Sequence, residues 1–201
     1  MGVIEMRNYV LIVDKSGSMG DPVKRGSSTS RWDAVKEYAE TFARECSKLD
    51  PDGIDLYFFN QRFTRFENAT SDQVRDAFSR NAPMGGTDFV PVLTDAIDRH
   101  FAGDRPTTIL IITDGDPSDG VQGQRALANL IIDTTKKMEA DAELALSFIQ
   151  IGEDLAATQF LKKLDDELES VGAKFDIVDT KTCDDLNNMT IQDVLLAAIN
   201  D

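Results

Sequence analysis

The chain has few of the residues that build covalent cross-links or transition-metal sites. It contains two cysteines, Cys46 and Cys183, and one histidine, His100, among 201 residues. The cysteines are far apart and belong to no Cys-x-x-Cys pair, so the sequence predicts neither a zinc site nor a disulfide framework, and we expect both to be buried thiols. A Ser-His-Asp triad would have to pair His100 with Ser16 or Ser18, and no Gly-x-Ser-x-Gly elbow supports that pairing.

Long apolar runs and an excess of positive charge are also missing. The first apolar run, from Tyr9 to Val13, stops at Asp14, and no stretch approaches the roughly 20 apolar residues of a membrane helix. We therefore expect a cytoplasmic protein that lacks a secretory signal and does not enter a membrane. Lys and Arg number 21 against 36 Asp and Glu, and the resulting net charge of −15 repels nucleic acid and anionic lipid.

What the chain does contain is typical of one soluble α/β domain spanning residues 1–201, with 41% hydrophobic and 28% charged residues. Short β-branched or aromatic runs alternate with helical patterns, which predicts a doubly wound, Rossmann-like, mostly parallel six-stranded sheet with helices on both faces. The expected strands are residues 8–13, 54–59, 62–66 (an antiparallel edge strand), 107–113, 144–151 and 174–178. The expected helices follow residue 30 and span about residues 71–80, 88–101, 124–140, 158–169 and 191–200.

Oxygen-bearing side chains follow two of these strands. Right-handed crossovers would place the strand ending at Val13 beside the strand ending at Thr113, at the point where the winding order reverses. Ligands of open parallel sheets bind outside the carboxyl ends of the strands at that point. The candidate ligands there are Asp14, Ser16, Ser18 and Asp114, joined by Thr87 after the Gly85-Gly86 pair.

These five side chains are hard oxygen donors, two carboxylates and three hydroxyls. Such a set suits Mg²⁺, with Ca²⁺ or Mn²⁺ as alternatives, and is poor for zinc or copper. Only about two negative charges would face a divalent ion, so a carboxylate from a partner is the natural ligand for an open coordination position.

Three segments in the expected order carry a resemblance to a known family: LIVDKSGSM, GGTDF and IITDGDP. Over residues 7–199 the chain resembles the von Willebrand factor type A domain, with all five positions of that family's metal-ion-dependent adhesion site. The resemblance implies direct metal coordination by Ser16, Ser18 and, in a high-affinity state, Thr87, with Asp14 and Asp114 acting directly or through water.

The resemblance also implies a function. It predicts an adaptor, not an enzyme, which binds an Asp or Glu of a partner protein through the metal. The DKSGSM form is similar to bacterial members found beside tellurite-resistance and related stress proteins. The segment GDPVKRGSSTS, from Gly20 to Ser30, is longer than the family pattern leads us to expect, and it would form either a flexible lid or a partner-specific loop.

Other functions remain open on sequence grounds. A magnesium-dependent phosphoesterase or hydrolase could use Asp14, Asp114, Asp116 and Asp119 to hold the ion and activate water. Against it, no general base or phosphate clamp is evident, and Lys15 is the one cation on the signature loop. The patterns of nucleotide-binding loops are absent. A third reading is an interaction module that uses an apolar surface and binds its partner without metal.

Overall fold

The computed structural model of the protein describes residues 7–182, 185 and 189–199. Its strands are β1 (Asn8–Asp14), β2 (Ile54–Phe59), β3 (Phe63–Ala69), β4 (Thr107–Thr113), β5 (Leu144–Gln150) and β6 (Val178–Thr182). The α-helices are α1 (Arg31–Cys46), α2 (Ser71–Ser79), α3 (Phe89–Ala102), α4 (Val121–Lys137), α5 (Leu155–Asp166) and α7 (Ile191–Ile199). Short 3₁₀ helices are η1 (Gly17–Gly20), η2 (Asp141–Glu143) and η3 (Glu169–Val171).

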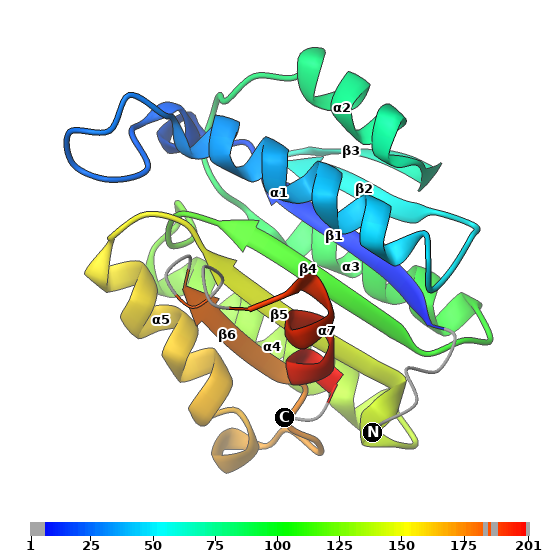
Figure 1. Cartoon of the computed structure of the whole chain (residues 1–201). Coiled ribbons are helices and arrows are strands. Elements are labelled where there is room, and N and C mark those ends of the chain that lie inside the picture. Colours follow the sequence, from blue (N-terminus) through cyan, green and yellow to red (C-terminus); the bar gives the residue numbers. More distant parts are fainter. Residues whose placement is uncertain (1–6, 183–184, 186–188, 200–201) are drawn as a thin grey trace.

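The six strands form one sheet in the order β3-β2-β1-β4-β5-β6 (Figure 1). All neighbouring strands are parallel except β2 and β3, which are joined by a short turn and pair antiparallel at the edge. The predicted fold class is therefore confirmed, including the placement of β1 beside β4. In the register of that pair Val13 lies opposite Ile112, so the two strands end at the same level.

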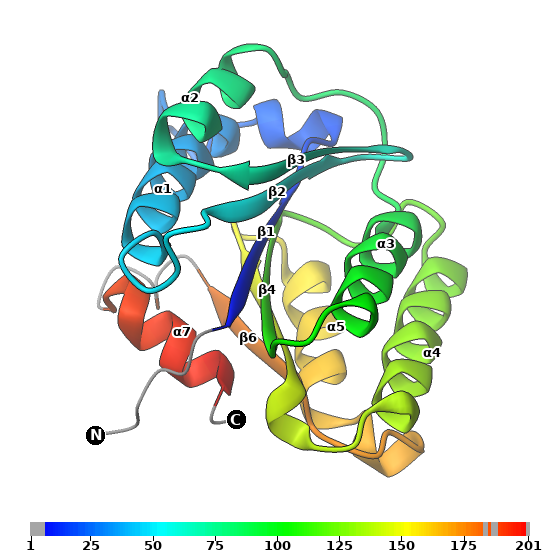
Figure 2. The same cartoon turned by 90° about the vertical axis from the view of Figure 1, so that its right-hand side faces the viewer.

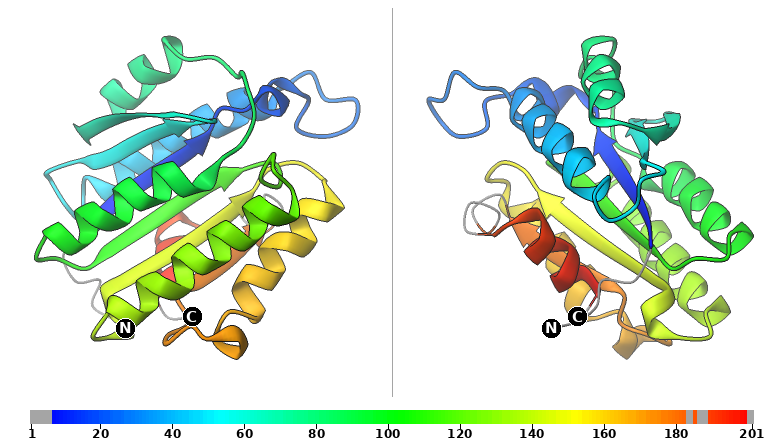
Figure 3. Two further views of the ribbon diagram at one scale, coloured as in Figure 1. Left: turned by 180° about the vertical axis from the view of Figure 1, so that it is seen from behind. Right: turned by 45° about the vertical axis from the view of Figure 1, so that its right-hand side comes forward.

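Helices cover both faces of the sheet (Figure 2). Because alternate residues of a strand point to opposite faces, β1 directs Leu11 and Val13 toward α1, α2 and α7, and Val10 and Ile12 toward α3, α4 and α5. The central strand β4 is buried at every position, which explains its unbroken apolar run. The rear view shows α3, α4 and α5 crossing their face side by side (Figure 3, left).

Polar caps set where several helices begin. Ser30 accepts a hydrogen bond from the backbone N–H of Asp33 at the start of α1, as the sequence suggested. Thr70 and Gln73 form the predicted capping box of α2. The cap predicted for α7 is also present, since Thr190 Oγ1 and the backbone N–H of Asp193 are 3.2 Å apart.

Several predicted boundaries were wrong. The helix expected over residues 124–140 is Val121–Lys137, which is three residues earlier at both ends, and the edge strand expected over residues 62–66 is Phe63–Ala69. The last strand is Val178–Thr182 and not residues 174–178, because pairing with β5 starts only where Val178 lies opposite Leu146, and the strand continues through polar residues on the sheet edge. The fifth helix begins at Leu155, about three residues early, because the Asp154 side chain accepts hydrogen bonds from the N–H groups of Ala156 and Ala157.

Cys46 is a fully buried free thiol, and burial raises its pKa, as expected for a structural cysteine. Cys183 lies outside the described residues. Within the described part of the chain, no helix has the length and hydrophobicity needed to span a membrane.

Candidate metal centre

The first part of the site is the loop that leaves β1. Asp14 is the last residue of that strand, and its Oδ1 accepts a hydrogen bond of 2.7 Å from the backbone N–H of Ser16. The chain then enters η1, which brings Ser16 Oγ within 3.2 Å of Ser18 Oγ. The alternate spacing of Asp14, Ser16 and Ser18 thus places their oxygen atoms on one side of the loop.

The second part follows the neighbouring strand β4. Ser18 Oγ donates a hydrogen bond of 3.0 Å to Asp114 Oδ1, across 96 residues of sequence. Thr113, the last residue of β4, donates from its Oγ1 to Asp14 Oδ2 at 2.8 Å. These contacts join the carboxyl ends of the two central strands, as the strand order predicted.

The third part is the loop that carries Thr87. Its Oγ1 lies 3.5 Å from Asp14 Oδ2, while its backbone N–H donates to Ser118 Oγ at 2.7 Å. The loop is tied to the signature loop by a 2.9 Å hydrogen bond from Gly17 N to Gly85 O. A Cβ at Gly86 would lie 2.5 Å from Ser118 Oγ, so a side chain there would press on the hydroxyl that holds the backbone of Thr87. The structure therefore brings together all five residues singled out from the sequence.

Burial gives the site an unusual electrostatic character. Asp14 is 0% exposed and Asp114 2% exposed, whereas Ser18 is exposed at the open side. Burial, with a smaller contribution from the nearby Asp114 charge, raises the pKa of Asp14 to about 6, although hydrogen bonds from Ser16 and Thr113 act in the opposite direction. Two neighbouring buried carboxylates are costly unless a cation accompanies them.

The donor set fits a hard divalent cation. The five side chains offer oxygen alone, which favours Mg²⁺, Ca²⁺ or Mn²⁺. Among residues 7–182, 185 and 189–199, no three His, Cys, Asp or Glu side chains gather as a metal cluster, so a cation here would depend on the hydroxyl groups. A bound cation would also bring positive charge next to the buried Asp14 and Asp114.

Sequence reasoning missed Arg31, the first residue of α1. Its Nη1 forms an ion pair with Asp114 Oδ2 and donates a 3.2 Å hydrogen bond to the backbone oxygen of Ser18. Nothing in the motif spacing marks this arginine. Thr113 was assigned only to the strand, and Ser118 only to a turn-rich loop, although both position ligand candidates.

The acids of the enzymatic alternative are arranged differently. Asp116 Oδ2 accepts a hydrogen bond of 3.1 Å from Gln124, burial raises the pKa of Asp116, and Asp119 is exposed. Neither has a hydrogen bond to Asp14 or Asp114 among the described residues. His100 bonds Thr107 at the amino end of β4, the opposite end of the sheet from Ser16, so it cannot complete a triad there.

The segment between η1 and α1 is a hydrogen-bonded hairpin. Pro22 and Ser30 form an antiparallel bridge, Val23 N donates to Thr29 O at 2.9 Å, and Ser27 N donates to Lys24 O at 2.9 Å. The hairpin projects from the body of the protein beside the start of α1 (Figure 1). Its base is tied to the start of α1, where the backbone N–H of Arg31 donates to Asp21 O at 2.9 Å.

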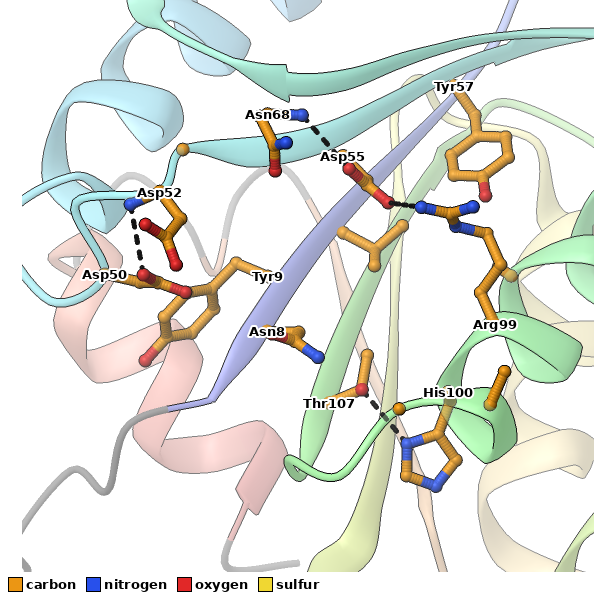
Figure 4. Close-up of a pocket in the computed structure, with 15 residues that line it drawn as sticks. Asn8, Tyr9, Asp50, Asp52, Asp55, Tyr57, Asn68, Arg99, His100 and Thr107 are labelled. Carbon is orange, nitrogen blue, oxygen red and sulfur yellow. Dashed lines mark hydrogen bonds and ion pairs between the residues drawn. The ribbon is translucent and has the colours of Figure 1, made fainter.

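A cavity of about 370 Å³ lies at the amino ends of the strands (Figure 4). Asp50, Asp52 and Asp55 gather there, but Arg105 lies 3.5 and 3.6 Å from the first two, and Arg99 lies 3.3 Å from the third. Arginines of the chain thus already pair with all three carboxylates. We therefore attribute the charged lining of this cavity to internal ion pairs and not to a binding site.

Comparison with known proteins identifies the family. The model of the von Willebrand factor type A domain matches residues 9–117, more than half of the chain, and the chain belongs to this family. Two von Willebrand factor A domain-containing proteins of Dictyostelium discoideum are 25% identical over 126 residues, which is 58% of this chain. The chain spans only 14% and 12% of the length of these relatives. Domains of this family typically serve as interaction modules.

Solved structures share the fold at low sequence identity. The minor pilin PilB of Streptococcus sanguinis has a TM-score of 0.70 and 12% identity, and the match covers 96% of this chain and 61% of that chain. The von Willebrand factor domain of the pilus tip protein Mfa5 of Porphyromonas gingivalis has a TM-score of 0.60 and 12% identity, covering 100% and 98%. Proximal thread matrix protein 1 of the mussel byssus, with zinc in its metal-ion-dependent adhesion site (MIDAS) motif, has a TM-score of 0.54 and 14% identity. That match covers 98% of this chain and 47% of that chain.

Proposed function

We propose that the chain, as one von Willebrand factor type A domain over residues 1–201, binds a divalent cation and through it an acidic residue of a partner protein. The cation would be held by Asp14, Ser16, Ser18, Thr87 and Asp114. The observation that carries the proposal is the meeting of these five oxygen-bearing side chains, through contacts of 3.5 Å or less, around two buried carboxylates.

Each residue has a distinct task in this proposal. Asp14 supplies the buried charge, and Thr113 and the backbone N–H of Ser16 fix its two carboxylate oxygens. Asp114 supplies the second charge and orients the hydroxyl of Ser18. When bound, the cation supplies an open coordination position for a carboxylate from outside the chain.

The surface around the site also supports docking. Met84, Val121 and Leu155 are large apolar residues that are 63%, 62% and 75% exposed. Met84 is hydrogen-bonded through its backbone to Lys15 in the signature loop, and the other two begin α4 and α5, the helices that follow β4 and β5. Exposed apolar residues beside a charged contact are typical of protein interfaces.

Physiological context is a separate part of the proposal. Mg²⁺ is our first choice of cation because it is abundant and accepts oxygen ligands with retained waters. Zn²⁺ belongs in the same titration because the mussel protein holds zinc in its motif. We place the domain in the cytoplasm, within a bacterial tellurite-resistance or related stress system. Unchanged tellurite tolerance after deletion of the gene would contradict that placement.

The test is calorimetric titration of chelator-stripped protein with Mg²⁺, Mn²⁺, Ca²⁺ and Zn²⁺. We expect one site in the wild type and none in Asp14→Ala or Ser16→Ala, because each variant removes an oxygen ligand. Asp119→Ala is the matched control, since this acid is exposed and should leave binding unchanged. Cation-dependent capture of an acidic partner should disappear in the same two variants. Unchanged metal affinity and unchanged capture would overturn the proposal.

A further inference from the structure

The starting point is the placement of Arg31 at the first turn of α1. A helix N-terminus carries partial positive charge, so an arginine at this position is electrostatically unfavourable unless a negative group compensates it. Asp114 provides that group, because its Oδ2 pairs with the Arg31 guanidinium while its Oδ1 accepts from Ser18. Arg31 therefore contacts two of the five proposed metal ligands, Ser18 through the backbone oxygen and Asp114 through the carboxylate.

The surroundings hold the guanidinium at this place. The loop after β5 passes directly beside it, and a Cβ on Gly152 would lie 2.8 Å from Arg31 Nε and 3.1 Å from Cζ. Gly152 also has φ +92°, a conformation that favours glycine. The backbone N–H of Arg31 donates to Asp21 O at 2.9 Å, which ties the same residue to the base of the hairpin. The side chain is only 18% exposed.

Charge gives this contact a consequence for metal binding. A guanidinium group is a fixed positive charge in proteins, so Arg31 places one such charge against the pair Asp14 and Asp114. A divalent cation bound by the same side chains would lie within several ångströms of that charge. At an effective dielectric constant of about 20, such repulsion is large enough to change a binding constant by at least about tenfold.

We propose that Arg31 is a built-in counter-cation of the metal site, which neutralises Asp114 when no metal is bound and lowers the affinity for divalent cations. This inference rests on the proposed function, because it concerns the same site. Arg31 is a positioning residue here and not a ligand.

The experiment titrates Mg²⁺ and Mn²⁺ into stripped wild type, Arg31→Gln, Arg31→Lys and Arg44→Gln. Glutamine keeps a hydrogen-bond donor but removes the charge, so we expect its affinity to rise at least about tenfold. Lysine keeps the charge and should stay within about threefold of wild type, by the same reasoning. Arg44→Gln removes an equal charge from the exposed far end of α1 and should have no effect.

Thermal unfolding gives a second reading of the same variants. Without Arg31, two neighbouring buried carboxylates lose their cation, so metal-free Arg31→Gln should melt below wild type. The rise in Tm on adding Mg²⁺ should then be larger in the variant than in wild type, since tighter binding stabilises the folded state more. Arg31→Met is the second neutral variant if Arg31→Gln does not fold.

The outcomes separate the two proposals. Binding that is lost in Asp14→Ala but equal or weaker in Arg31→Gln overturns the counter-cation and leaves the metal site in place. Binding detected in Arg31→Gln but not in wild type supports both. No binding in wild type or in either neutral variant overturns both.

Discussion

The hydrogen bond from Thr113 to Asp14 offers the sharpest test of how the site is built. Thr113 is 0% exposed, and its Oγ1 donates to Asp14 Oδ2 at 2.8 Å. Thr113→Val keeps the shape of the side chain and removes the donor. A hydrogen bond to a charged group contributes about 1.5–3 kcal/mol, and the carboxylate would remain buried without it. We therefore expect the free energy of unfolding to fall by about 2 kcal/mol.

Urea unfolding of metal-free protein at pH 7.5 measures this loss, above the pKa of about 6 to which burial raises Asp14. With a urea slope of about 2 kcal/mol per molar, the midpoint should move by about 1 M, with an unchanged slope. Thr113→Ser is the matched control, because it keeps the hydroxyl and loses one methyl group, at a cost of about 1 kcal/mol.

The same variants report on the proposed metal site. A residue that fixes a metal ligand typically changes metal affinity by about 10–100-fold, so Thr113→Val should weaken Mg²⁺ binding to that degree, while Thr113→Ser should not. The reasoning would be refuted if valine cost no more stability than serine. In that case the contact between Thr113 and Asp14 would contribute nothing beyond packing.

Gly86 and His100 offer two further tests. Gly86→Ala should weaken Mg²⁺ binding at least about tenfold, because the added Cβ would press on Ser118 Oγ and displace Thr87. Combining Gly86→Ala with Ser118→Ala should recover part of the loss. Equal calorimetric Mg²⁺ affinities of Gly86→Ala and wild type would contradict this prediction. Burial lowers the pKa of His100, so the folded state resists protonation of this side chain. The stability that neutral His100 contributes is therefore present above about pH 6.5 and is lost as the pH falls. His100→Asn should reduce the fall in urea midpoint between about pH 7 and 5, and an equal fall in wild type and variant would contradict this prediction.

The part of the site that sequence predicted is the part that strand ends dictate. Asp14 and Asp114 follow strongly apolar strands, and parallel neighbours end at one edge, so their proximity follows from strand order alone. Thr87 was found because a Gly-Gly pair precedes it, and glycine is what close backbone approach requires. Ser16 and Ser18 follow from alternate spacing within one loop.

The part that sequence did not predict depends on side chains meeting across long separations. Arg31 and Asp114 are 83 residues apart, and only the packed positions of α1 and the loop after β4 bring them together. The last strand was misplaced because most of its residues are polar and carry no strand pattern. Its limits are set by pairing with β5, which the local sequence does not reveal. For α5 a signal existed, since Asp154 is a good N-cap residue that was not used.

The contacts of the two buried carboxylates account for all four of their oxygen atoms. Each oxygen of Asp14 and Asp114 has a donor within the chain: Ser16 N and Thr113 for the first, Ser18 and Arg31 for the second. A bound cation would therefore replace or share existing interactions, and would not fill an empty cage. The net affinity of the site for the cation then depends on how strongly the internal donors hold these carboxylate oxygens. The strongest of those donors is the charged guanidinium of Arg31.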